Sequence, residues 1–137
     1  MKSFINIILC ICILFSYSIR SEDIPYLLTA SSKGDIESVK AIIDSGGNPN
    51  TEDGNKVTAL MYASRKNQVE VARYLISKGA EVNKQEIDGW TALMYASKNN
   101  YSDMVELLIN NNADLKVTDS DGWTAYGLAA TSGNHQT

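Results

Sequence analysis

One short sequence recurs along this chain at a constant interval. The segment Thr-Ala-Leu-Met-Tyr-Ala-Ser occupies residues 58–64 and again residues 91–97, and a degenerate copy, Thr-Ala-Tyr-Gly-Leu-Ala-Ala, occupies residues 124–130. The copies begin at positions 58, 91 and 124, so the interval is 33 each time, and the same step back from Ala63 leads to Ala30, inside a related segment. A constant period of roughly 20 to 50 residues is typical of solenoids, whose units bury their apolar faces against one another. We therefore expect stacked units with an extended surface, which favours binding over catalysis.

Each unit is expected to contain two short helices. In the second unit, residues 59–66 should form the first helix, and residues 69–78, with apolar side chains at helical spacing, the second. Gly79 then stands where a helix ends in the left-handed conformation that glycine adopts without strain. The third unit matches it, with a first helix over residues 92–99 and with Asn112, the next most tolerant residue type, in place of the glycine.

The first 21 residues differ in character from the rest of the chain. One basic residue precedes an almost unbroken apolar run over residues 4–15, and small polar residues follow. This pattern predicts a secretory signal peptide over residues 1–21, cleaved after Ser18 or, less favourably, after Ser21. The alternative is an uncleaved membrane anchor over residues 4–19, although this run falls short of the roughly 20 apolar residues that span a bilayer. The protein is therefore expected to be exported, as a periplasmic or secreted protein.

Export leaves a chain without cysteine, because Cys10 and Cys12 both lie inside the predicted signal. A mature protein that starts at Glu22 can form neither a disulfide nor a thiolate metal site, so packing alone must stabilise it. From Glu22 onward the chain has 10 basic and 16 acidic residues, a formal charge of −6. This charge argues against nucleic acid or an anionic membrane surface as a partner, since both attract clustered Lys and Arg.

The residues between and within the helices resemble the ankyrin repeat. The turns read Asp-Gly-Trp-Thr at residues 88–91 and 121–124, and the second helices carry the pairs Leu75-Ile76 and Leu108-Ile109. Residues 79–83 read Gly-Ala-Glu-Val-Asn, close to the family's Gly-Ala-Asp-Val-Asn ending. A tetratricopeptide array, with a period of about 34 residues, predicts neither the turn nor this ending. The resemblance implies an all-α solenoid of helix-turn-helix units joined by short β-turn hairpin loops.

The resemblance also implies how the chain divides. It covers nearly all of residues 22–137, as units at about 24–54, 55–87 and 88–120 and a half repeat at 121–137. Pro25 replaces the threonine of the first unit, which suits an N-terminal cap. The last unit stops where its second helix should begin, so we expect an apolar face that includes Leu128 to be partly uncovered, and residues 132–137 to be poorly ordered. The sequence leaves open whether this end is a natural cap or a truncation.

Three departures from the family pattern stand out. Alanine replaces the usual proline at Ala59, Ala92 and Ala125, and Met61 and Met94 replace a histidine that hydrogen-bonds between turns. These units should rely more on apolar packing.

The turn of the second unit is the third departure. Lys56 replaces its glycine, while the nearby Gly54 offers another position for the turn.

No catalytic constellation is present in the sequence. His135 is the only histidine, and no nucleophile elbow, phosphate-binding glycine loop or His/Cys cluster accompanies it. Asp119, Asp121 and Gly122 suggest a calcium loop, but the EF-hand spacing and its glutamate are missing, and the turn itself requires Asp-Gly. We expect no enzyme activity, no cofactor and no metal.

Five residues are the candidates for a protein-binding surface. Trp90 and Trp123 follow the turn glycine in successive units, at a position that faces the concave binding side in the family, and Val57 is their equivalent in the second unit. Tryptophan is enriched in binding hot spots. Arg65 and Lys98 recur at a second family contact position. Alternatively, the two rings only rigidify the hairpins, and the two charges are merely solvated.

Two functions follow from this pattern. The first is a non-enzymatic protein-binding module, with Tyr62 and Tyr95 partly buried as packing residues. The second is a structural or assembly protein of the cell envelope, which stacks through its open C-terminal repeat. The partner is expected to be a protein of unknown identity, and a monomer is favoured.

Overall fold

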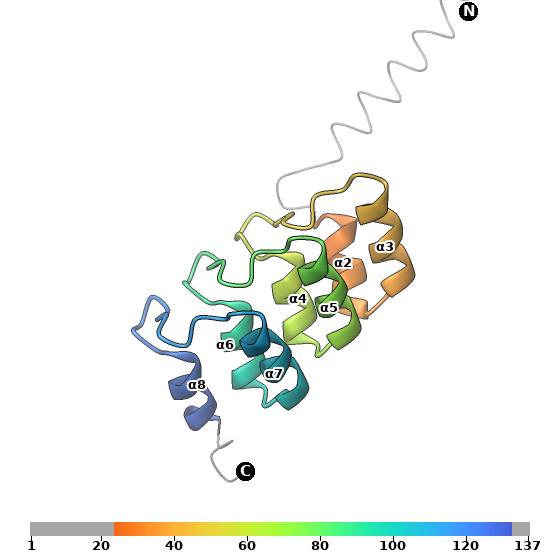
Figure 1. Ribbon diagram of the computed structural model, residues 1–137. Coiled ribbons are helices and arrows are strands. Elements are labelled where there is room, and N and C mark those ends of the chain that lie inside the picture. Colours follow the sequence, from red (N-terminus) through yellow and green to blue (C-terminus); the bar gives the residue numbers. More distant parts are fainter. Residues whose placement is uncertain (1–23, 133–137) are drawn as a thin grey trace, which may run out of the picture.

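Seven short helices make up the part of the chain that the computed structural model describes, residues 24–132 (Figure 1). Within these residues the β pairing is a single antiparallel bridge, between Glu52 and Thr58. The expected all-α solenoid is thus confirmed. In chain order the helices are α2 (Tyr26–Lys33), α3 (Ile36–Asp44), α4 (Ala59–Arg65), α5 (Val69–Ser77), α6 (Ala92–Lys98), α7 (Ser102–Asn110) and α8 (Ala125–Thr131).

The helices lie in two rows (Figure 1). The first helices of successive units, α2, α4, α6 and α8, pack against one another, and the second helices α3, α5 and α7 form the other row. The loops between units project beside the row of first helices as hairpins. The core lies where each helix pair meets its neighbours, and its largest fully buried apolar side chains are Leu28, Leu60, Met61, Leu75, Met94, Met104, Leu108, Val39 and Val71.

A threonine begins each of the last three first helices. The Oγ1 atoms of Thr58, Thr91 and Thr124 accept hydrogen bonds from the backbone N–H three residues further on, at 3.3, 3.3 and 3.2 Å. Such a cap satisfies one backbone donor that the helix leaves unpaired, a contribution of about 1 kcal/mol. The helices begin at the residues that the sequence predicts, and α4, α5 and α6 each end one residue earlier than expected.

Residues with positive φ end the helices. Gly79 has a φ of 98° and Asn112 a φ of 70°, which confirms the left-handed conformation expected at both positions. Asn67 and Asn100, with φ of 58° and 59°, take the same left-handed conformation between the two helices of a unit.

The turn of the second unit does not move to Gly54. Lys56 itself takes the left-handed conformation, with a φ of 65°, at the position where Gly89 and Gly122 have φ of 84° and 85° in the next two units. The backbone hydrogen bonds of the hairpin therefore impose on a lysine a conformation that favours glycine.

Asparagine side chains connect the loops that follow the second helices. Asn50 donates from Nδ2 to the Gly79 carbonyl at 3.1 Å, and its Oδ1 accepts from the Glu81 backbone N–H at 2.7 Å. Asn83 makes the same two bonds to the following unit, at 3.0 and 2.7 Å. Each asparagine thus satisfies backbone groups of the next unit, which fixes the stacking register.

The two ends of the solenoid differ from the inner units. Pro25 precedes α2 at the N-cap position, in keeping with the N-terminal cap. The expectation of an uncovered Leu128 is wrong: this side chain is 6% exposed, because α8 packs closely on α6. The predicted signal, residues 1–21, and His135 lie outside the described residues. Among residues 24–132 no helix has the length and apolar character needed to cross a membrane.

Candidate protein-binding surface

A carboxylate organises each of the three hairpins. Asp53, Glu86 and Asp119 occupy the same position in successive units, and one oxygen of each accepts hydrogen bonds from the backbone N–H groups two and four residues further on, at 2.7 to 3.0 Å. In the last two hairpins the N–H four residues on belongs to Trp90 and Trp123. The carboxylates therefore fix the backbone of both candidate tryptophans.

Two tyrosines hold the other oxygen of these carboxylates. The Tyr62 hydroxyl donates to Asp53 Oδ2 at 2.7 Å, and the Tyr95 hydroxyl donates to Glu86 Oε2 at 3.3 Å. Burial first, and the neighbouring carboxylate second, raise the pKa of each tyrosine to about 12. Both tyrosines are partly buried, as expected. Leu128 stands at the equivalent position of the last unit and has no hydroxyl.

Successive hairpins are hydrogen-bonded to one another. The Ile87 backbone N–H donates to the Asn55 carbonyl at 3.0 Å, and one unit on the Ser120 N–H donates to the Asp88 carbonyl at 2.9 Å. The Ser120 hydroxyl donates to the same carbonyl at 2.7 Å. The hairpins thus form a continuous platform rather than separate loops, and a side chain on one keeps its place relative to the next.

The two tryptophans lie on this platform with different exposure. Trp90 is half-buried, and its ring centroid lies 4.9 Å from that of Tyr95 with the planes tilted by 48°. Trp123 is 45% exposed, and its ring lies so close to Gly127 that an added Cβ there would be only 2.9 Å from it. Trp123 therefore offers the larger free indole surface.

The two candidate cations lie along the row of first helices. The Arg65 guanidinium is placed over the Tyr62 ring at 5.3 Å and over the Tyr95 ring at 5.5 Å, so it bridges two units. Lys98, one unit further on, donates from Nζ to Thr131 Oγ1 at 3.3 Å. Both interactions hold a flexible side chain against the surface.

Val57 does not share this exposure. Its side chain is 5% exposed and belongs to the hydrophobic core, because a short β-branched side chain at this position fits inside where an indole does not. It therefore offers almost no area to a partner. We call the remaining candidates, Trp90, Trp123, Arg65 and Lys98, the hairpin strip.

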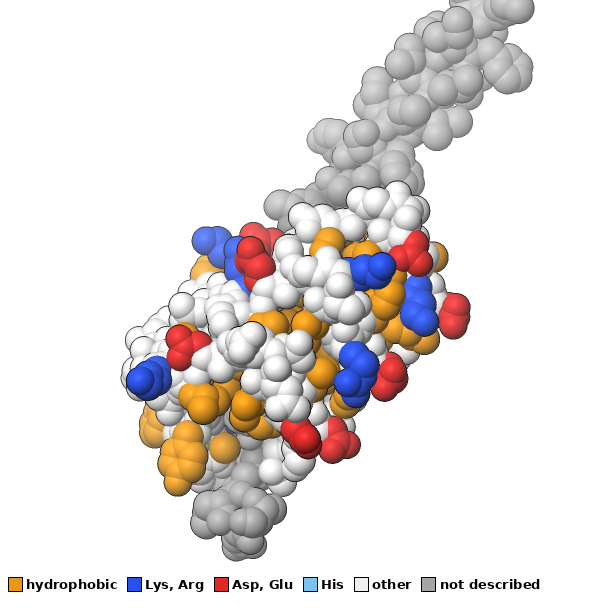
Figure 2. Space-filling view, in the orientation of Figure 1, with side chains coloured by type: hydrophobic (Ala, Val, Ile, Leu, Met, Phe, Trp, Pro, Cys, Tyr) orange, Lys and Arg blue, Asp and Glu red, His pale blue; other side chains and the backbone are white. Residues whose placement is uncertain are grey.

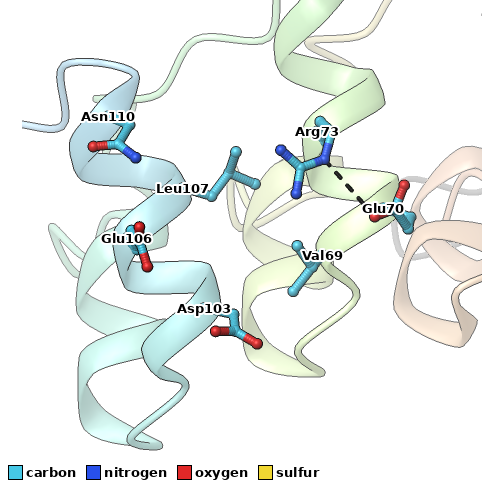
Figure 3. Close-up of a pocket in the computed structure, with 7 residues that line it drawn as sticks. All are labelled: Val69, Glu70, Arg73, Asp103, Glu106, Leu107 and Asn110. Atoms are coloured by element: carbon cyan, nitrogen blue, oxygen red, sulfur yellow. Dashed lines mark ion pairs between the residues drawn. The ribbon is translucent and has the colours of Figure 1, made fainter.

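A groove of about 430 Å³ lies on the opposite side, between the second helices α5 and α7 (Figure 3). Glu70 and Arg73 of α5 pair at 3.8 Å on one wall. No group of three or more His, Cys, Asp or Glu side chains within residues 24–132 is arranged to hold a metal ion. Polar and charged side chains predominate in the lining of the groove. It is lined by Val69, Glu70, Arg73, Asp103, Glu106, Leu107 and Asn110.

The C-terminal end carries a feature that the sequence analysis missed. Tyr126 is 84% exposed, whereas Leu60 and Leu93, its equivalents in the two preceding units, are 1% and 2% exposed. A groove of about 440 Å³ also lies between α7 and α8, lined in part by Ile109 of α7 and Ala129 of α8. Figure 2 shows hydrophobic side chains gathered in the same region of the molecule. A comparison of residues 60, 93 and 126 in the sequence would have revealed the change.

The hairpin carboxylates were also missed. They recur at the same interval as the tryptophans, so the signal was present in the sequence. The residue type is not constant along the repeat, since Glu86 stands between Asp53 and Asp119.

Stacked helix pairs with hydrogen-bonded hairpins define an α-solenoid repeat protein. The chain belongs to the ankyrin repeat family: the model of this family, described as ankyrin repeats in three copies, matches residues 10–86, 26–119 and 82–137. No curated protein matches the chain. Ankyrin repeats are generally protein–protein interaction modules and are typically not enzymes.

Proposed function

We propose that this chain is a non-enzymatic module that binds another protein through the hairpin strip. The observation that carries the proposal is the indole of Trp123, which is 45% exposed on a hairpin that the Asp119 carboxylate holds in place. A large side chain that is ordered before binding loses little conformational entropy when a partner covers it. Tryptophan in such a position is characteristic of binding hot spots.

Capture from the native source tests the proposal. Full-length wild-type chain and the variants Trp123→Ala and Tyr126→Ala are compared as baits, with their folds checked by circular dichroism. Trp123 and Tyr126 are both exposed aromatic residues near α8, but only Trp123 belongs to the strip. The proposal requires a protein that the wild type and Tyr126→Ala retain and that Trp123→Ala loses. Equal retention by all three baits contradicts it.

Export is the second part of the proposal. The apolar run over residues 4–15, with Lys2 before it and small polar residues after it, suits a secreted or periplasmic protein. The N-terminal residue of the protein isolated from the exported fraction tests this part. A start just after Ser18 or Ser21 supports a cleaved signal, and an intact N-terminus in the membrane fraction supports an anchor over residues 4–19. A chain that stays in the cytosol contradicts export.

Assembly through the C-terminal end is a second candidate function. The exposed Tyr126, at a position that is buried in the inner units, favours it. The full-length chain would then show a mass in light scattering that rises with concentration, and Tyr126→Asp would suppress the rise. A strict monomer at all concentrations contradicts assembly and leaves the hairpin strip as the interaction surface.

A further inference from the structure

The hairpin strip consists of two repeated pairs. Arg65 and Trp90 form the first pair, linked by the Tyr95 ring that both contact. Lys98 and Trp123 occupy the equivalent positions of the next unit, so the second pair repeats the first one unit along the stack. Each pair combines an aromatic surface with a cation. A partner that occupies both pairs must therefore present the same chemistry twice.

Arg65 is arranged to receive an anion. Its guanidinium lies over the rings of Tyr62 and Tyr95, whose hydroxyls are hydrogen-bonded to Asp53 and Glu86. Those two carboxylates are thus engaged by tyrosine and backbone donors, and within residues 24–132 Arg65 forms no ion pair with any carboxylate. The planar fork of a guanidinium matches a carboxylate, and the contacts with the two rings hold the Arg65 side chain in place before a ligand binds.

The spacing of the helices that carry the two cations suits one extended conformation of the partner. The helices that carry the two cations, α4 and α6, pack directly on each other, and packed helices lie about 8–10 Å apart. A polyproline II helix has about three residues per turn and advances about 9.3 Å per turn, so residues i and i+3 face the same side at this spacing. A β-strand repeats its face at about 6.6 Å and does not match. Aromatic surfaces are also what proline-rich segments bind.

Resting on the proposed function, we infer that the hairpin strip binds a polyproline II segment of the partner protein that carries carboxylates at positions i and i+3. One carboxylate pairs with Arg65 and the next with Lys98, while the residues between them lie against Trp90 and Trp123. The specificity is in the spacing of the acidic residues rather than in their number.

Two peptide isomers of identical composition and one glutamine analogue test this inference. One proline-rich peptide carries glutamate at every third position, a second carries the same number of glutamates at intervals of two and four, and a third carries glutamine at every third position. Trp90 and Trp123 are the two tryptophans of the whole chain, so tryptophan emission of the full-length protein reports binding of peptides that contain none. The variant Arg65→Gln is compared with the control variant Arg73→Gln. Arg73 lies on α5, in the outer row of helices.

The inference predicts that the first peptide binds at least tenfold more tightly than its isomer and its glutamine analogue. Arg65→Gln should weaken this binding at least tenfold and Arg73→Gln less than twofold. Equal binding of the isomers, equal effects of the two arginine variants, or no binding of any peptide overturns the inference. In each of these cases the proposed function still stands if Trp123→Ala abolishes capture of the native partner, so the two failures are distinguishable.

Discussion

At the scale of single residues, the pairing of Tyr62 with Asp53 makes stability depend on pH. The pKa of Tyr62 is raised to about 12 in the folded chain, above the value of about 10 for an exposed tyrosine. Between these values the unfolded chain has lost the proton and the folded chain has kept it, so stability falls as pH rises. We expect a constant free energy of unfolding up to about pH 10 and a decline from there towards pH 12.

Tyr62→Phe tests this account. It removes the hydroxyl that donates to Asp53 Oδ2 at 2.7 Å, which should cost about 1 kcal/mol at neutral pH. It should also flatten the decline above pH 10, leaving the part that Tyr95 and Tyr74, whose pKa values are raised as well, contribute. Urea denaturation at pH 7, 10 and 11 measures both effects. A decline as steep in Tyr62→Phe as in the wild type would refute the role of this hydroxyl.

Lys56 carries backbone strain that glycine would relieve. The left-handed conformation costs a residue with a side chain roughly 1–2 kcal/mol of folding free energy. Glycine avoids this cost, but its greater freedom in the unfolded chain offsets about 0.5–1 kcal/mol of the benefit. Because Lys56 has a φ of 65°, we expect Lys56→Gly to stabilise the protein by about 0.5–1 kcal/mol in thermal or urea unfolding. Lys56→Ala is the control, since it removes the charge but keeps the strain. A similar gain in both variants would assign the effect to charge.

At the scale of elements, Gly89 and Gly122 provide a matched pair that isolates the contact between hairpins. Their φ values are 84° and 85°, so alanine meets the same strain at both. A Cβ at Gly89 would also lie 3.0 Å from Asp119 Cα and 3.0 Å from Ser120 N in the next hairpin. Around a Cβ at Gly122, apart from its chain neighbours, no atom of the described residues lies within 4 Å.

Gly89→Ala should therefore destabilise the chain by roughly 1–3 kcal/mol more than Gly122→Ala, because the added Cβ meets backbone that cannot rotate away. The difference between the urea unfolding midpoints of the two variants measures this extra loss of stability. Equal midpoints would mean that the hairpins shift apart freely and are not the rigid platform on which the binding proposal depends.

The elements themselves could be predicted from sequence because their signals are local. Threonine caps α4, α6 and α8, and Gly79 and Asn112 follow the ends of α5 and α7, so these helices carry their own boundary signals. The turn at Lys56 could not be predicted, since lysine is a poor choice for positive φ and only the hairpin hydrogen bonds impose it.

At the scale of the whole molecule, prediction of the surface was less complete than prediction of the stack. Equivalent positions in a repeat share a backbone environment but not burial: Val57 lies in the core, Trp90 is half-buried, and Trp123 is 45% exposed. Burial depends on side-chain size and on the neighbouring unit, which a single-unit alignment does not describe. Leu128 was expected to be uncovered and proved to be buried, whereas Tyr126 is the large apolar residue that α8 exposes.

The stack accounts for the stability of a chain without cysteine after residue 12. Each inner helix packs on its own partner and on the equivalent helices of the neighbouring units, and side-chain amides add hydrogen bonds across each loop. These shared contacts join the hairpins into one surface along the molecule, so a partner meets several units at once. The central claim is that this surface, and not the outer row of helices or the C-terminal end, is the binding site.

Hydrogen exchange of the full-length chain, alone and with its captured partner, tests this claim most directly. The hairpin platform predicts slower exchange of the backbone N–H groups in residues 84–91 and 117–124 when the partner is bound, with little change in α5 and α7. Protection confined to α5 and α7, or to the end of α8 around Tyr126, would contradict it and move the binding site to the outer groove or to the open end of the stack.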